Sequence, residues 1–210
     1  MPHAGMAHAG MPHAGTLTQA CLTRRILRPM PPATVPAPPR RLFSAVFADA
    51  ALGAAIDAER RRWVGLPPRL RPAPERLHLT LQFCPRAMPA QQAAWLSALA
   101  ALRFAPFDIV LTHAERWRTP GGAIVVLRPA PSAALTALHQ ASQALAEQAG
   151  VPPEPRAWTP HVTVLRQADQ VAPAPLAAPL PWRVRQVALV WSDLQAQPPR
   201  YHRLGEFPAR

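Results

Sequence analysis

Two short apolar segments of the chain each carry a His and a Thr two residues apart. They are His78-Leu79-Thr80-Leu81 and His161-Val162-Thr163-Val164. In a β-strand, successive side chains point to opposite faces of the sheet, so each His lies beside its Thr while the residue between them faces a core. The spacing therefore predicts two half-buried strands, each of which presents an imidazole and a hydroxyl on one face.

The two pairs together indicate more than either one alone. A single His on a strand is most often a surface or structural residue. With ten Thr among 210 residues, the eight His should give only about 0.4 such pairs by chance. If both strands face one cleft, two imidazoles and two hydroxyls meet there. Imidazole titrates near neutral pH and a hydroxyl donates to phosphoryl oxygens, so this set suits acid/base chemistry on a phosphate.

The hydrophobic pattern around the two pairs predicts a mixture of strands and helices. The period of two is cleanest over residues 77–83. The expected strands are 42–47, 77–83, 107–112, 123–128, 160–165, 183–192 and 200–204, and the expected helices are 49–63, 89–102 and 131–149. Because strands and helices are mixed and each half has its own His strand, we predict an α+β fold of two lobes around a central cleft.

The first 39 residues have a different composition from the rest. They open with three near-copies of Met-Pro-His-Ala-Gly and continue through a run of prolines. Such a segment has no amphipathic period, so we predict that residues 1–39 are a disordered His/Pro-rich extension and that residues 40–210 form one domain. The extension also resembles a transit peptide in composition, and a true start at Met30 is an equal alternative.

The charge of the chain predicts an anionic partner. The formal net charge is +12, and all 23 basic residues are Arg. Such a field attracts nucleic acid or a nucleotide, whereas a solvated cationic surface without a partner is the alternative. The two cysteines, Cys21 and Cys84, form neither a disulfide framework nor a zinc spacing. No apolar run approaches the roughly 20 residues of a membrane span. We therefore expect a cytoplasmic protein with no membrane partner.

Longer stretches around the two pairs carry a family resemblance. They are 41–43 (Arg-Leu-Phe), 77–83 (Leu-His-Leu-Thr-Leu-Gln-Phe) and 156–166 (Arg-Ala-Trp-Thr-Pro-His-Val-Thr-Val-Leu-Arg). Over about residues 41–208 the chain resembles the 2H phosphoesterases, and more narrowly the bacterial RNA 2′,3′-cyclic phosphodiesterases, also called 2′-5′ RNA ligases. The resemblance implies a bilobal, pseudo-twofold fold in which two antiparallel sheets line the cleft and helices lie outside.

The resemblance also implies an activity, which is hydrolysis of RNA 2′,3′-cyclic phosphate ends to 2′-phosphates together with reversible 2′-5′ joining. One group must take a proton from water and another must give one to the departing 3′ oxygen. We assign His78 as the donor and His161 as the acceptor, although the symmetry of the motifs allows the reverse. Thr80 and Thr163 would donate to non-bridging oxygens. No metal and no cofactor is implied, and the expected partner of a monomeric enzyme is RNA with a cyclic phosphate end or a cyclic nucleotide.

Three further residues match substrate-binding positions of the family. Arg166 matches an arginine at the phosphate, where a guanidinium can hold two oxygens. Strict alternation from His161 puts Arg166 on the other face, so the strand must end or bulge near Leu165 for it to reach the cleft, and a surface Arg is the alternative. Phe83 matches an aromatic residue near the nucleobase, and Trp158 is a similar candidate. Strand parity instead puts Phe83 on the core face.

Two other classes of function are compatible with these residues. A nucleic-acid binding module could keep the cleft without turnover, and it would retain its affinity for RNA when both His are replaced. A transition-metal site could use His78 and His161, and it would carry stoichiometric zinc. The sequence offers no obvious third ligand for such a metal.

Overall fold

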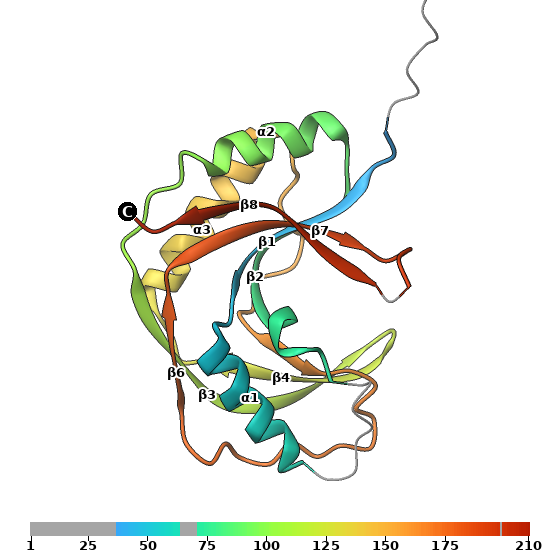
Figure 1. Cartoon of the computed structure of the whole chain (residues 1–210), viewed down its shortest axis with the longest axis vertical. Helices are drawn as coiled ribbons and strands as arrows, with labels where there is room; N and C mark the ends of the chain where they lie inside the picture. Colours follow the sequence, from blue (N-terminus) through green and yellow to red (C-terminus); the bar gives the residue numbers. More distant parts are fainter. Residues whose placement is uncertain (1–36, 64–70, 198) are drawn as a thin grey trace, which may run out of the picture. The chain divides into compact units, whose positions relative to one another are not determined.

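The computed structural model describes residues 37–63, 71–197 and 199–210 (Figure 1). The predictions for the start of the chain, including the repeats and the alternative start at Met30, lie outside these residues. The first described strand begins at Arg40. Among the described residues, no helix is both long enough and apolar enough to cross a membrane.

In the part of the chain that the structure describes, eight strands form one curled antiparallel sheet (Figure 1). Its order is β6-β3-β4-β5-β2-β1-β7-β8, so the halves β6-β3-β4-β5 and β2-β1-β7-β8 meet between β5 and β2. A single registered pair, Leu79 with Val162, joins them. The predicted fold class is confirmed, with the difference that the two predicted sheets are joined into one by the pairing of β2 with β5. The strands are β1 Arg40–Phe47, β2 His78–Ala87, β3 Phe107–Thr119, β4 Gly122–Pro129, β5 Val162–Leu165, β6 Leu180–Val184, β7 Gln186–Asp193 and β8 Arg200–Pro208.

Two equivalent strand–helix–strand units build the halves. The helical elements are α1 Ala50–Arg61, the short 3₁₀ helix η2 Pro74–Arg76, α2 Pro89–Leu99 and α3 Ala133–Gln148. α1 begins 83 positions before α3 (133 minus 50), which is also the separation of the two His residues (161 minus 78). α1, which follows β1, packs on β5 and β6, whereas α3, which follows β4, packs on β2 and on α2. α1 therefore packs on the half that contains His161, and α3 packs on the half that contains His78.

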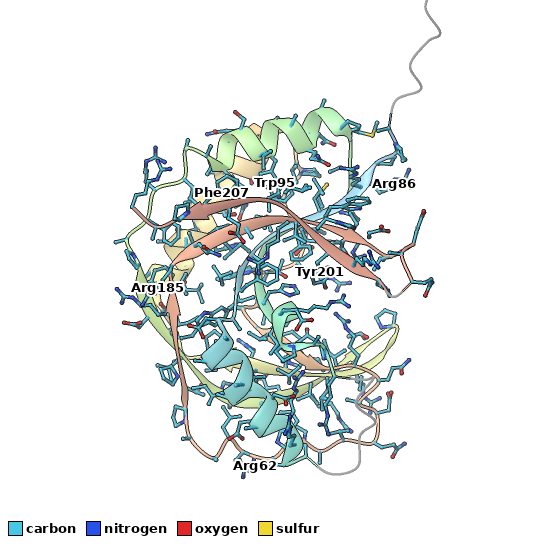
Figure 2. The ribbon with its side chains drawn as sticks, viewed as in Figure 1. Arg62, Arg86, Trp95, Arg185, Tyr201 and Phe207 are labelled. Carbon is cyan, nitrogen blue, oxygen red and sulfur yellow. The ribbon has the colours of Figure 1, made fainter. Side chains whose placement is uncertain are left out.

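Helix caps and a continuous core fix these units. The side chains of Asp49 and Ser132 accept hydrogen bonds from backbone N–H groups in the first turns of α1 and α3, at 2.8 Å and 3.2 Å. Trp95 of α2 is fully buried between that helix and the sheet (Figure 2). Leu79 and Val162, which separate the His from the Thr in each pair, are also fully buried. Burial of each side chain of this size stabilises the fold by about 1.5–3 kcal/mol.

One predicted strand is wrong. The chain over residues 183–192 forms two strands that are separated at Arg185, because β6 and β7 belong to different halves of the sheet. β6 pairs with β3 in one half, and β7 pairs with β1 in the other. A single straight strand cannot reach both partners. Two consecutive polar residues, Arg185 and Gln186, shift the alternation at the crossing point, but only the pairing of the strands shows that the chain changes partners there.

Candidate active site

His78 lies at the start of β2, where aromatic rings surround it. Its ring stacks on Phe43 at 4.8 Å between centroids, lies 5.2 Å from Phe47, and meets Tyr201 edge-on at 5.6 Å. Tyr201 comes from β8 and is labelled in Figure 2, on the side of its half that faces the other half. Nδ1 of His78 lies 2.6 Å from the carbonyl oxygen of Arg76. A carbonyl only accepts, so Nδ1 donates and Nε2 is left for a substrate.

His161 repeats this arrangement directly before β5. Its Nδ1 donates to the carbonyl oxygen of Thr159 at 2.7 Å, so the same nitrogen of each imidazole is held by the backbone two residues upstream. The ring lies 4.6 Å from Trp117 of β3. Arg128 holds the preceding residue, because its Nε donates to the carbonyl oxygen of Pro160 at 2.9 Å. Both rings therefore have a fixed tautomer with Nε2 available for proton transfer.

The register between β2 and β5 brings the two motifs together. Leu79 pairs with Val162 in an antiparallel arrangement. One position on either side of that pair, His78 comes next to Thr163, and Thr80 comes next to His161. Cross-strand neighbours of this kind have Cβ atoms about 5 Å apart and share a face. The four residues therefore lie crosswise on one surface, which we call the site face (His78, Thr80, His161 and Thr163).

Arg166 lies within electrostatic reach of both imidazoles. β5 ends at Leu165, and Gln167 has a φ of 51°, in the left-handed region, so the chain turns away from the strand at this point. Arg166 is exposed, and its positive charge lowers the pKa of both His78 and His161. The strand end that Arg166 needs in order to reach the site face is present.

Near pH 7, the neutral form of both imidazoles predominates in the free site. Burial is the main cause that lowers the pKa of His78 to about 4, and the positive charges of Arg166, His161 and Arg76 lower it further. The pKa of His161 is also lowered from its ordinary value of 6.5, first by burial and then by Arg128 and Arg166. Positive charges that act on both imidazoles favour an anion between them.

Phe83 lies on the site face, contrary to the prediction from strand parity. Ala45 of β1 pairs with Thr80, whereas Ser44 pairs with Gln82, so Leu81 is an extra residue in a β-bulge. The bulge reverses the alternation. Phe83 therefore lies opposite Phe43, whose ring stacks on His78, and Gln82 turns into the core with 4% of its surface exposed. The guanidinium of Arg41 covers the Phe83 ring at 4.5 Å.

Trp158 contacts the backbone of β2. Its indole Nε1–H donates to the carbonyl oxygen of Thr80 at 3.0 Å, and its ring stacks on His139 of α3 at 4.0 Å with 3° between the planes. The indole thus binds the main chain of Thr80 rather than its hydroxyl.

Some residues of the site are not identified by the spacing of the two His-Thr pairs. Phe47, Tyr201 and Trp117 surround the two imidazoles, yet no spacing in the sequence links any of them to a His. Their places follow from sheet pairings between distant strands. Within the described ranges, no group of three or more His, Cys, Asp and Glu side chains could hold a metal ion.

Residues 51–196 match the sequence model of the 2′-5′ RNA ligase superfamily. The chain belongs to this superfamily. The predicted resemblance to the 2H phosphoesterases is thereby confirmed, and it makes the protein a member of a superfamily of phosphoesterases and ligases. No curated protein matches the chain.

Several solved structures share the fold over most of this chain. A crystal structure described as a phosphoesterase has 26% sequence identity and a TM-score of 0.71, and the match covers 81% of this chain and 98% of that one. Escherichia coli LigT complexed with 3′-AMP has 25% identity and a TM-score of 0.70, with 81% and 98% covered. The protein TT0787 of Thermus thermophilus has 27% identity and a TM-score of 0.60, with the same coverage.

Proposed function

We propose that the protein hydrolyses RNA 2′,3′-cyclic phosphate ends to 2′-phosphates without a metal ion. The observation that carries this proposal is the pairing of Leu79 with Val162, which places one His-Thr pair beside the other. Through its Nε2 atom, one imidazole can take a proton from the attacking water, and the other can give a proton to the leaving oxygen of the same phosphate. The 3′-AMP in the LigT structure is a ribonucleotide phosphate of the size that such a site takes.

The reaction needs one bond to form and one to break at phosphorus. The oxygen of water attacks the phosphorus while His161 takes a proton from that water at Nε2. The bond from phosphorus to O3′ breaks, and His78 gives a proton to O3′. The products are a 2′-phosphate and a free 3′-hydroxyl. If a 5′-hydroxyl of RNA replaces water, the same step forms a 2′-5′ phosphodiester.

The remaining groups stabilise the added phosphoryl charge. The hydroxyls of Thr80 and Thr163 each donate to a non-bridging oxygen, and the guanidinium of Arg166 binds two oxygens at once. His78 is the donor in this proposal, and the anionic substrate raises its low pKa toward neutrality. All these groups belong to one chain, so the proposed enzyme is complete as a monomer.

The experiment that tests the function is product identification. The EDTA-treated protein is incubated with an oligoribonucleotide that ends in a 2′,3′-cyclic phosphate, and ³¹P NMR identifies the product. A 2′-phosphate is expected. A 3′-phosphate, or turnover that disappears with EDTA and returns with zinc, contradicts the proposal. RNA binding without turnover instead supports the binding-module alternative.

The pH dependence of kcat/KM follows from the shifted pKa values. The active form of the free enzyme carries one proton on the imidazole pair, so activity falls when the pH drops through the lower pKa and when it rises through the higher one. In the free enzyme the pKa of His78 is about 4 and that of His161 is lowered below 6.5, so the productive form, with the proton on His78 and none on His161, is the minor singly protonated form. The bell keeps its shape because both forms carry one proton. We expect a bell whose alkaline limb begins below pH 6.5 and falls about tenfold per pH unit. A flat profile from pH 5 to 9 contradicts it.

Phe83 should matter more for long substrates than for short ones. Phe83 pairs with Phe43, and His78 pairs with Phe47, so Phe83 lies four strand positions from His78 along β1, or about 13 Å. That distance places it beyond the nucleotide that carries the cyclic phosphate. We expect Phe83→Ala to lower kcat/KM by roughly fivefold to a hundredfold for an oligoribonucleotide. The rate with a 2′,3′-cyclic mononucleotide should stay within about twofold, and an equal loss for both substrates contradicts the role.

A further inference from the structure

The carbonyls of Thr80 and Leu81 lie at the bulge in β2, just past the one residue, Leu79, at which β2 pairs with β5. Leu81 is the extra residue opposite β1. Backbone carbonyls away from water need hydrogen-bond donors. Trp158 supplies one to Thr80 through Nε1–H at 3.0 Å. Nδ1 of His139 lies 3.0 Å from the carbonyl oxygen of Leu81 and 3.2 Å from Nε2 of Gln82; because a carbonyl only accepts, Nδ1 donates to Leu81 and does not accept from the Gln82 amide.

The two donor rings also hold each other. The imidazole of His139 and the indole of Trp158 are parallel within 3° at a centroid distance of 4.0 Å. His139 comes from α3, and Trp158 comes from the segment that leads into β5. We call this stacked pair the ring clamp (His139 and Trp158). It fixes the backbone where the strand alternation reverses and where Thr80 and Phe83 come to share a face.

In the half that contains β5, the equivalent carbonyl, that of Val164, also accepts a hydrogen bond. Val164 follows Thr163 as Leu81 follows Thr80, and it lies 83 positions further along (164 minus 81). The guanidinium of Arg60, on α1, donates to the carbonyl oxygen of Val164 at 3.4 Å. In each half, the helix that crosses from the other unit therefore donates to the carbonyl directly after the Thr. Different side chains, His139 and Arg60, bind the equivalent carbonyl in the two halves. A hydrogen bond to the residue after each Thr therefore fixes the backbone next to the Thr hydroxyl.

We propose that the ring clamp positions the hydroxyl of Thr80 for the phosphate, with His139 and Trp158 as positioning residues. This inference rests on the proposed function. Without the clamp, the bulge can slide along β2, and the Thr80 hydroxyl loses its fixed place beside His161. Because the hydroxyl stabilises charge that develops during the reaction, its displacement lowers kcat more than it raises KM.

Conservative variants distinguish the effect of losing an N–H donor from the effect of losing a stacked ring. Trp158→Phe keeps a stacking ring without the N–H, and His139→Leu removes the other donor. Each is expected to lower kcat by roughly three- to tenfold, with KM changed less than twofold. His139→Asn places an amide N–H near the position of Nδ1 and is expected to restore most of the rate. Equal losses for His139→Leu and His139→Asn overturn the proposal.

A double-mutant cycle shows which Thr the clamp serves. Trp158→Phe is combined with Thr80→Val in one protein and with Thr163→Val in another. If the clamp acts through Thr80, Trp158→Phe has little further effect once that hydroxyl is gone, but it keeps its full effect when Thr163 is replaced. Independent effects in both backgrounds overturn the proposal. The clamp borders a pocket of about 200 Å³, so these variants leave no sealed void in the core, and thermal unfolding checks that they fold.

An independent measurement keeps the clamp testable if the proposed reaction fails. Native-state hydrogen exchange of the backbone amides at Leu81, Gln82 and Phe83 is compared between the wild type and Trp158→Phe. Faster exchange confined to these amides supports the clamp, even in a protein without cyclic phosphodiesterase activity. Unchanged exchange there overturns it, whatever the activity.

Discussion

Replacing either imidazole of the site face with Ala is expected to lower kcat by about 10²–10⁴ for a 2′,3′-cyclic nucleotide. The expected result holds for both His78→Ala and His161→Ala, because one imidazole must accept a proton and the other must donate one in the same step. KM should change little, since neither imidazole carries charge in the free protein at pH 7. Single-turnover rates with a cyclic mononucleotide measure the loss.

The double variant provides the second part of this prediction. Groups that act in one step are not additive, so the protein without both imidazoles should be about as slow as either single variant. His202→Ala is the matched control, since His202 stacks on Trp191 and takes no part in the proposed reaction. Losses that multiply in the double variant, or normal turnover in either single variant, contradict acid/base catalysis by the pair.

Replacing Arg166 with Ala is expected to lower kcat/KM by about 10²–10³, because one guanidinium binds two oxygens of the charged phosphate. Arg166→Lys keeps the charge without the planar fork, so its loss should lie between those of the wild type and Arg166→Ala. Arg86→Ala is the control, because Arg86 is exposed near the other end of β2 (Figure 2). The same oligoribonucleotide assay serves all three variants.

Arg166→Ala should also move the pH profile, which a folding defect does not do. The positive charge of Arg166 lowers the pKa of both imidazoles, so its removal raises both values. The alkaline limb of kcat/KM then moves to higher pH, since the essential proton is held longer as the pH rises. An unchanged limb, or a move toward lower pH, contradicts the placement of Arg166 beside both rings.

Local patterns predicted most of the secondary structure and the two His-Thr pairs. Alternation over residues 77–83 placed Leu79 in the core, and the structure buries it fully. Ser132 and Gly150 bracket α3 as cap and stop, which follows from short-range backbone chemistry. These features depend on neighbours in the sequence, so the sequence is sufficient for them.

Long-range pairing decided the rest. The bulge at Leu81 appears only when β2 pairs with β1, and it alone moves Phe83 onto the site face. The break at Arg185 reflects pairing of β6 with β3 in one half of the sheet and of β7 with β1 in the other. Tyr201 reaches His78 because β8 lies beside β7, far along the chain from β2.

The sequence by itself determined which residues are the candidates for the chemistry, because a His and a Thr two positions apart on a strand share a face. Only the tertiary structure decided how the two pairs meet. The single registered pair of Leu79 with Val162 sets His78 against Thr163 and Thr80 against His161. Register between strands that are 83 residues apart (161 minus 78) is a property of the assembled sheet, because a slip by one position would turn every side chain to the other face.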